Sequence, residues 1–148
     1  MSAAAAITLK RPRPLRVVVI DDEPDTVITL LAILRDEGYE AEGFSNAKEA
    51  LRSIPNFLPD VIISDLAMPS PSGWDVARNV RALLGEKPML IAVSAQYTKD
   101  TDKRLAEIVG YNYYLTKPCD PDDLLRQARL PGSVQQEVAL TPLAVRLG

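Results

Sequence analysis

Short apolar runs alternate with amphipathic stretches along most of the chain. Five of the runs are rich in β-branched or aromatic residues, and each has the length of a single strand. One of them carries Glu40 and Glu42, which favours a strand at the edge of a sheet. The predicted strands are residues 15–20, 39–44, 60–64, 89–93 and 111–115.

The stretches that follow these strands have apolar residues at helical spacing and end signals of helices. Because strands and helices alternate through short connections, the strands should be parallel, with helices on both faces. This pattern predicts an α/β fold with a doubly wound, five-stranded parallel sheet. The predicted helices run from Glu23 and Pro24 to Gly38, from a Ser45 cap to Ile54, from Trp74 to Leu84, from Asp100 to Val109, and from an Asp120 cap to about Leu130.

The two ends differ in composition from the predicted fold. Residues 1–14 form a basic arm in which Lys10, Arg11 and Arg13 are interleaved with prolines. A charge run this short is typical of a solvated tail, and contact with nucleic acid or an acidic partner is the alternative. Residues 131–148 are too few for a second domain and are predicted to be a tail or linker. The predicted domain is therefore residues 15–130.

Composition excludes several classes of chemistry. The chain of 148 residues has no histidine, which excludes Ser-His and Cys-His catalytic pairs, histidine metal sites and a phosphohistidine on this chain. One cysteine allows no internal disulfide. No apolar run is long enough for a bilayer, and the net charge of -3 does not indicate a nucleic-acid coat. Glycine motifs for dinucleotides or a P-loop are missing. We expect a cytoplasmic protein.

Polar side chains follow four of the predicted strands. In an open parallel sheet, ligands bind outside the carboxyl ends of the strands. Singly, each such residue would be read as a helix cap, a turn or a solvated surface residue. Together they should gather at one edge of the sheet. They are Asp21 and Asp22 after the first strand, Asp65 after the third, Ser94 after the fourth, and Thr116 and Lys117 after the fifth.

This set of groups suits a metal ion and a phosphoryl group. Three close carboxylates repel one another unless a cation joins them. Mg²⁺ prefers oxygen ligands and completes its shell readily with phosphate oxygens. A carboxylate can attack phosphorus to form an acyl phosphate, and a lysine can offset the charge on the equatorial oxygens. Histidine is needed for none of these steps.

At this point the sequence resembles a bacterial response-regulator receiver domain over residues 15–130. The resemblance is carried by VVVIDDEPD at 17–25, SDLAMPSPSGWD at 64–75, VSA at 93–95 and YLTKP at 114–118. Each piece is weak alone, and the four in this order are specific. The resemblance implies a flavodoxin-like strand order, 2-1-3-4-5.

Carried over by position, the resemblance also implies roles at the site. Asp65 would accept the phosphoryl group. Asp22, Asp65 and the main-chain carbonyl of Ala67 would ligate Mg²⁺, with Asp21 acting largely through a metal-bound water.

The remaining roles concern the switch. Ser94 would be the switch hydroxyl, Tyr114 the switch aromatic and Lys117 the active-site lysine. The family has a cis peptide bond at the position of Pro118, and we expect one here. Ala67 and Gln96 flank the path of the hydrolytic water in the family, and the apolar Ala67 predicts slow self-dephosphorylation.

The resemblance implies a phosphorylation-dependent switch in a two-component phosphorelay. The donor would be a sensor histidine kinase or a histidine phosphotransfer protein. The signal would leave through the surface of the fourth helix, fifth strand and fifth helix, namely residues 97–109, 111–115 and 122–129. Its partner would be a downstream protein, or a second copy in a homodimer. No membrane or direct DNA contact is expected. Such a regulator is no enzyme, although it assists its own phosphorylation and slow self-dephosphorylation.

Three alternatives remain open. The chain, expected to be a stand-alone receiver, could be a fragment of a longer regulator or hybrid kinase. It could be a phosphatase of the haloacid-dehalogenase type, but those enzymes need an acidic residue two positions after the nucleophile. Ala67 stands there after Asp65, and after Asp21 the residue is Glu23 rather than aspartate. It could also be an interaction module that is never phosphorylated, which the complete set of site residues disfavours.

Overall fold

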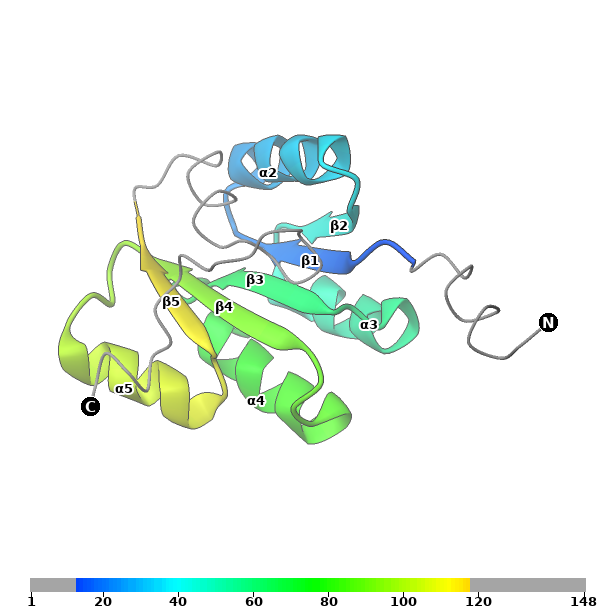
Figure 1. Ribbon diagram of the computed structural model, residues 1–148. Helices are drawn as coiled ribbons and strands as arrows, with labels where there is room; N and C mark the ends of the chain where they lie inside the picture. Colours follow the sequence, from blue (N-terminus) through cyan, green and yellow to red (C-terminus); the bar gives the residue numbers. More distant parts are fainter. Residues whose placement is uncertain (1–12, 118–148) are drawn as a thin grey trace, which may run out of the picture.

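A computed structural model describes residues 13–117, and within them five parallel strands form one sheet (Figure 1). The order β2-β1-β3-β4-β5 confirms the predicted topology. β2 and β5 are the two edges, so the prediction of an edge strand around Glu40 and Glu42 is also correct. The strands are β1 (Arg16–Ile20), β2 (Glu40–Phe44), β3 (Val61–Asp65), β4 (Met89–Ser94) and β5 (Tyr113–Thr116).

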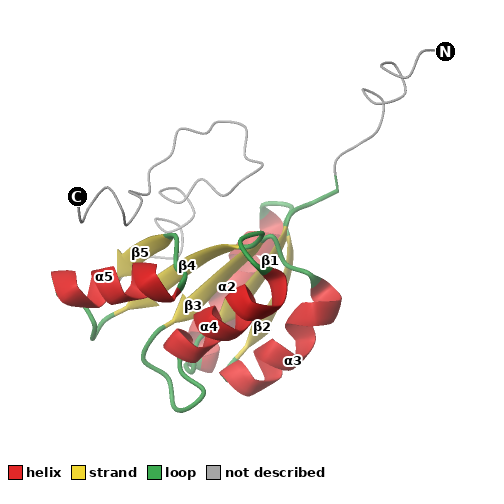
Figure 2. Ribbon diagram, turned by 90° about the horizontal axis from the view of Figure 1, so that it is seen from below, coloured by secondary structure: helices red, strands yellow, loops and turns green. Residues whose placement is uncertain are grey.

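Four described helices cover the two faces of the sheet. α2 lies on one face, and α3, α4 and α5 lie on the other, from which Figure 2 is seen. The doubly wound arrangement is therefore confirmed. The predicted helix at 120–130 lies outside the described residues. The helices are α2 (Pro24–Asp36), α3 (Ala47–Phe57), α4 (Gly73–Leu84) and α5 (Asp100–Val109).

Alternate residues of each central strand supply two separate cores. Val17 and Val19 of β1 pack with Leu30 and Leu34 of α2 on one face. Val18 of β1 points to the other face, in a core shared with α3, α4 and α5. Both faces of these strands are buried, which explains their unbroken β-branched sequence.

The start of α3 differs from the prediction. Asn46, not Ser45, is the N-cap, and its side chain accepts a hydrogen bond from the Glu49 amide at 2.9 Å. Both residue types can cap, so sequence alone does not fix the register by one residue. α3 also continues past Ile54 to Phe57. Pro55 is tolerated inside the helix because it lies in the last turn, where few helical hydrogen bonds remain to be lost.

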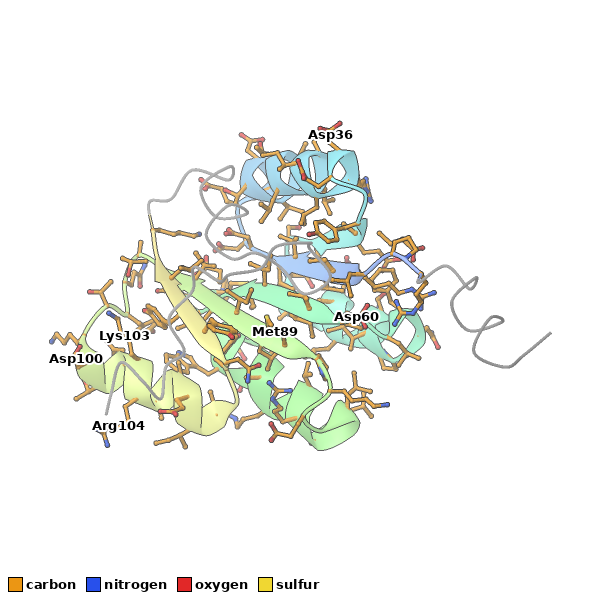
Figure 3. All side chains as sticks on the ribbon, in the orientation of Figure 1. Asp36, Asp60, Met89, Asp100, Lys103 and Arg104 are labelled. Atoms are coloured by element: carbon orange, nitrogen blue, oxygen red, sulfur yellow. The ribbon has the colours of Figure 1, made fainter. Side chains whose placement is uncertain are left out.

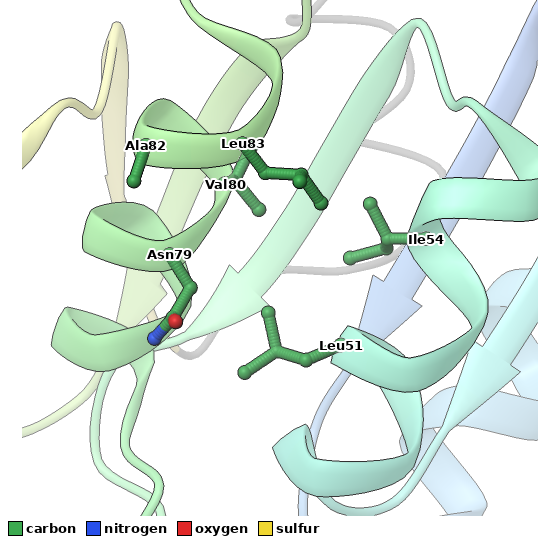
Figure 4. A pocket seen from close by; sticks show the side chains of 6 residues that line it. All are labelled: Leu51, Ile54, Asn79, Val80, Ala82 and Leu83. Atoms are coloured by element: carbon green, nitrogen blue, oxygen red, sulfur yellow. The ribbon is translucent and has the colours of Figure 1, made fainter.

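α3 and α4 pack side by side over the sheet and leave a shallow hollow between them (Figure 4). Its volume is about 290 Å³. Leu83 on its rim is 57% exposed, whereas Ile54 is fully buried. The hollow is lined by Leu51, Ile54, Asn79, Val80, Ala82 and Leu83.

At the amino end of the strands, Asp60, just before β3, binds the segment that leads into β1 (Figure 3). Arg13 donates two hydrogen bonds of 3.0 Å to its carboxylate, and the Arg16 amide donates a third of 2.9 Å. Arg13 was predicted to belong to the basic arm, so the last part of that arm contacts the fold. Partial burial acts to raise the pKa of Asp60, but Arg13 and Arg16 outweigh it and the pKa is lowered.

Asp60→Asn should therefore lower the free energy of unfolding by about 1 kcal/mol near neutral pH. A lowered pKa gives stability that is present above the ordinary pKa of an aspartate and lost as the pH falls through the folded value. The difference between wild type and variant should thus shrink in acid, which urea unfolding at several pH values would measure. Asp36→Asn, an exposed change on α2, is the control. A difference that grows in acid would contradict this account.

Candidate functional site

Three carboxylates meet at the carboxyl ends of β1 and β3. Asp65 is the last residue of β3, while Asp21 and Asp22 directly follow β1. These strands are neighbours, so one oxygen from each carboxylate lies within 4.8 Å of the others. Asp21 and Asp65 are buried, and Asp22 is exposed. Three oxygen donors this close, with one facing solvent, can hold a hard divalent cation.

Lys117 completes the cluster from the end of β5. Its Nζ lies 2.7 Å from Asp21 Oδ2 and 3.3 Å from Asp65 Oδ2. The Lys117 amide donates to the Ser94 carbonyl at 2.9 Å, which fixes the backbone beside β4. Burial acts to lower the pKa of Lys117, but the two carboxylates outweigh it and raise the pKa. The ammonium therefore stays charged beside Asp65.

Asp65 lies in a partly desolvated environment. Burial raises the pKa of its carboxyl, and the Asp21 carboxylate adds to the effect, while Lys117 and the Ala67 amide oppose it. That amide donates to Asp65 Oδ1 at 3.0 Å. Because the other oxygen faces Lys117, both oxygens of Asp65 have fixed directions. A carboxylate that is desolvated and oriented in this way is suited to act as a nucleophile.

Ser94 and Tyr114 are buried on neighbouring strands at the same end of the sheet. The Ser94 hydroxyl oxygen accepts hydrogen bonds from the amides of Gln96 and Tyr97, at 3.2 and 3.1 Å. The Tyr114 hydroxyl is buried and makes no hydrogen bond within the described part of the chain. Lys103 Nζ lies 5.7 Å from the centre of the Tyr114 ring. Burial raises the pKa of the Tyr114 hydroxyl, and the nearby Ser94 side chain opposes that shift.

Gly73 holds the loop after Asp65 in place. Its amide donates to the Leu66 carbonyl at 3.2 Å. A Cβ at this position would lie 2.2 Å from the Asp65 carbonyl oxygen and 2.6 Å from Leu66 Cα, so only glycine fits. α4 begins here with a capping box between Ser72 and Asp75. The tight turn thus follows from a missing side chain and a strong helix cap.

Other predicted site residues lie around this cluster. Ala67 is half-buried, while Thr116 and Gln96 are exposed. The predicted cis bond before Pro118 falls outside the described residues, and the described chain has a cis bond at Ser70-Pro71. An open groove of about 410 Å³ adjoins Asp22, between the start of α3 and residues 68–71.

Sequence reasoning missed one buried polar residue near the site. The hydroxyl of Tyr111 donates to the Gly73 carbonyl at 2.7 Å. From sequence, Tyr111 was predicted to belong to the strand 111–115 and to the surface that contacts a partner, but it lies before β5 and is buried. Neither the direction of the ring nor the presence of an acceptor can be read from spacing.

Comparison with known proteins decides the family. The model of the response regulator receiver domain matches residues 17–129. The chain belongs to this family. The match covers most of the chain and includes the strand ends that carry the carboxylates and Lys117. The chain thus contains a receiver domain of the kind found in two-component response regulators, which are signalling proteins.

The receiver domain has relatives of two sizes. It is 42% identical over 111 residues to an uncharacterized 14.6 kDa protein in the sodA1 3′ region of Leptolyngbya boryana, covering 74% of this chain and 84% of that protein. It is 38% identical to the transcriptional regulatory protein KdpE of Mycobacterium tuberculosis, covering 86% of this chain and 54% of KdpE. The chain thus spans about half the length of relatives such as KdpE.

Solved structures agree with this assignment. The chemotaxis protein CheY4 of Vibrio cholerae superimposes with a TM-score of 0.73 at 28% identity, covering 78% of this chain and 97% of that chain. A CheY-like receiver domain from Methanospirillum hungatei gives 0.72 at 26% identity, covering 78% and 91%. Within residues 13–117, no helix is long and apolar enough to cross a membrane.

Proposed function

We propose that this receiver domain, residues 15–130, is a phosphorylation-dependent switch whose phosphoacceptor is Asp65. The observation that carries the proposal is the position of its carboxylate. It lies 3.3 Å from the Lys117 ammonium and within 4.8 Å of the oxygens of Asp21 and Asp22. The donor is the phosphohistidine of a sensor histidine kinase or a histidine phosphotransfer protein, since this chain has no histidine of its own.

The donor set fits Mg²⁺, because all three groups are carboxylates and one of them faces solvent. Asp22, Asp65 and the main-chain carbonyl of Ala67 would hold the ion, with Asp21 acting through a bound water. When bound, the ion supplies positive charge to the phosphoryl oxygens.

The chain's own residues perform the remaining chemistry. The Asp65 carboxylate attacks phosphorus, a new P–O bond forms, and the P–N bond to the donor imidazole breaks, with its electron pair leaving on the imidazole nitrogen. Lys117, held by Asp21 at 2.7 Å, offsets negative charge on the transferring group. The amide of Ala67 fixes the direction of the Asp65 carboxylate throughout.

The modified site then differs in charge and in hydrogen-bond acceptors. A phosphoryl group brings a charge near -2 and three acceptor oxygens. The Ser94 hydroxyl oxygen accepts two backbone hydrogen bonds in the unmodified structure, and its proton can be donated to the phosphoryl oxygens. Tyr114, whose hydroxyl makes no hydrogen bond among residues 13–117, rotates as Ser94 moves. The surface of α5, β5 and residues 122–129 changes in consequence, and a downstream protein or second copy reads it.

Intact-mass analysis after incubation with acetyl phosphate and Mg²⁺ tests the proposal. We expect one phosphoryl group on wild type and none when EDTA removes the metal. Asp22→Asn should raise the Mg²⁺ concentration needed for half-maximal phosphorylation by at least about tenfold, because it removes a metal ligand. Asp25→Asn, an exposed change one turn away, is the matched control and should behave as wild type. An unmodified wild-type mass would refute the proposal.

A further inference from the structure

Residues 110–112 connect α5 to β5, and they contact α4 at both of its ends. Near the end of α4, Arg81 donates two hydrogen bonds to the Gly110 carbonyl, at 3.0 and 2.7 Å. It donates a third to the Asn112 side chain at 2.9 Å. At the first residue of α4, the Tyr111 hydroxyl donates to the Gly73 carbonyl. The connection is thus attached to α4 at its first residue and in its last turn.

Arg81 also packs directly on this connection. A Cβ on Gly110 would lie 2.6 Å from Arg81 Cγ, and Gly110 has a φ of +126°. Arg81 further donates to the Gly85 and Pro88 carbonyls, at 2.9 and 2.8 Å. A planar guanidinium with several fixed acceptors is held rigidly. Residues 110–112 are therefore held in a fixed position relative to the last turn of α4.

The other end of the attachment is the buried phenol. Tyr111 is 2% exposed and is the largest side chain buried to this degree among residues 13–117. Burial raises the pKa of its hydroxyl well above the ordinary value, so it stays protonated and able to donate. The acceptor, the Gly73 carbonyl, belongs to the residue whose backbone runs so close to Asp65 that an added Cβ would collide with the Asp65 carbonyl oxygen. One hydrogen bond therefore separates Tyr111 from the backbone contact with the phosphoacceptor.

We propose that Tyr111 is a positioning residue that couples Asp65 to the connection between α5 and β5, through Gly73. This coupling rests on the proposed function and is separate from the route through Ser94 and Tyr114. A shift of the backbone at Asp65 and Leu66 reaches Gly73, because the gap is too small for a Cβ and the Gly73 amide donates to the Leu66 carbonyl. The hydrogen bond from Tyr111 then passes the shift to residues 110–112. Coupling is reciprocal, so loosening Tyr111 must also weaken binding at Asp65.

Tyr111→Phe tests the coupling, because it keeps the ring and removes only the hydroxyl. Beryllofluoride with Mg²⁺ serves as the phosphoryl mimic. Trp74 adjoins Gly73 and makes an edge-to-face contact with Tyr97 at 5.4 Å, so its fluorescence reports binding. We expect Tyr111→Phe to weaken beryllofluoride binding about three- to tenfold. Tyr113→Phe, the same change at a half-buried position of β5, should alter it less than about twofold.

A second measurement distinguishes coupling from a loss of stability. In amide NMR spectra, beryllofluoride should shift the signals of residues 110–112 in wild type. That shift should be reduced by half or more in Tyr111→Phe, while the response at Ser94 persists. If Tyr111→Phe unfolds more easily but binds and responds as wild type does, the residue is only structural and the coupling is refuted.

Two further outcomes are decisive. Should Tyr111→Phe fail to fold, Arg81→Lys tests the other end of the attachment, because lysine keeps the charge and loses the planar fork. It should reduce the shift at residues 110–112, and an unchanged shift would refute the coupling. A wild-type protein that does not respond to beryllofluoride at all would refute the proposed function together with the coupling. A normal wild-type response with an unaltered Tyr111→Phe would refute the coupling alone.

Discussion

Replacing Asp65 with asparagine should abolish the phosphoryl adduct and raise the thermal stability of the unmodified protein. The first effect follows because an amide cannot act as the attacking carboxylate. The second follows because Asp65 is buried and close to Asp21, so its negative charge is unfavourable in the folded state. Lys117 keeps its contact of 2.7 Å with Asp21 and is not left without a counter-charge.

The pH dependence of this gain is fixed by the direction of the pKa shift. The folded protein binds a proton at Asp65 more tightly than the unfolded chain does. The contribution of this group to stability is therefore largest below the ordinary pKa of an aspartate and is lost as the pH rises through the raised value. Asparagine removes that loss. At neutral pH we expect a Tm higher by about 2–6 °C, and the gain should disappear in acid.

Thermal unfolding with and without Mg²⁺, together with intact-mass analysis, measures both effects. Mg²⁺ should raise the Tm of wild type more than that of Asp65→Asn, since it binds the folded carboxylates. Asp36→Asn, on the exposed side of α2, controls for the loss of a negative charge. A lower Tm for Asp65→Asn would contradict the account of the electrostatics. A phosphoryl adduct that persists in Asp65→Asn would show that another residue is the acceptor.

Gly73→Ala should be the most destabilising single methyl group that can be added near the site. The new Cβ would meet two backbone atoms, the Asp65 carbonyl oxygen at 2.2 Å and Leu66 Cα at 2.6 Å. Backbone atoms of a buried strand end cannot move aside as a side chain can. We expect a loss of about 3 kcal/mol or more in the free energy of unfolding. The displaced acceptor should also be phosphorylated far more slowly.

Gly38→Ala is the matched control for this prediction. Gly38 has a φ of +96° and open space around it, so alanine there meets a backbone penalty without a steric clash. That penalty is about 1–2 kcal/mol. Urea unfolding of both variants separates the two causes. Equal losses would mean that the loop after Asp65 adjusts freely, which would also weaken the case for coupling through Tyr111.

The sequence predicted the architecture well because its signals are local. The β-branched run at 17–20 favours a strand, and Pro24 and Gly38 favour the start and the end of a helix. These signals act through the conformations of neighbouring residues. The joint position of Asp21, Asp22, Asp65 and Lys117 also followed, because parallel strands end at one edge of the sheet. Local signals were weaker at boundaries, where Asn46 rather than Ser45 caps α3.

Tertiary structure alone decided which residues contact one another across the fold. Arg13 lies in a basic arm by composition, yet it pairs with Asp60, which is 47 positions away. Gly73 matches a loop motif, but the reason that it must be glycine is its contact with the Asp65 backbone. Tyr111 was predicted to lie on a partner surface, yet it is buried and its hydroxyl donates to an acceptor 38 positions away.

The sequence by itself thus determined the strands and helices, their parallel arrangement and the set of groups at the carboxyl edge. The folded chain decided the distances among those groups, the desolvation that raises the pKa of Asp65, and the attachment of residues 110–112 to α4. The physical reason is that periodicity records the environment of each residue along its own element. Burial and hydrogen bonding between distant segments depend on how those elements pack.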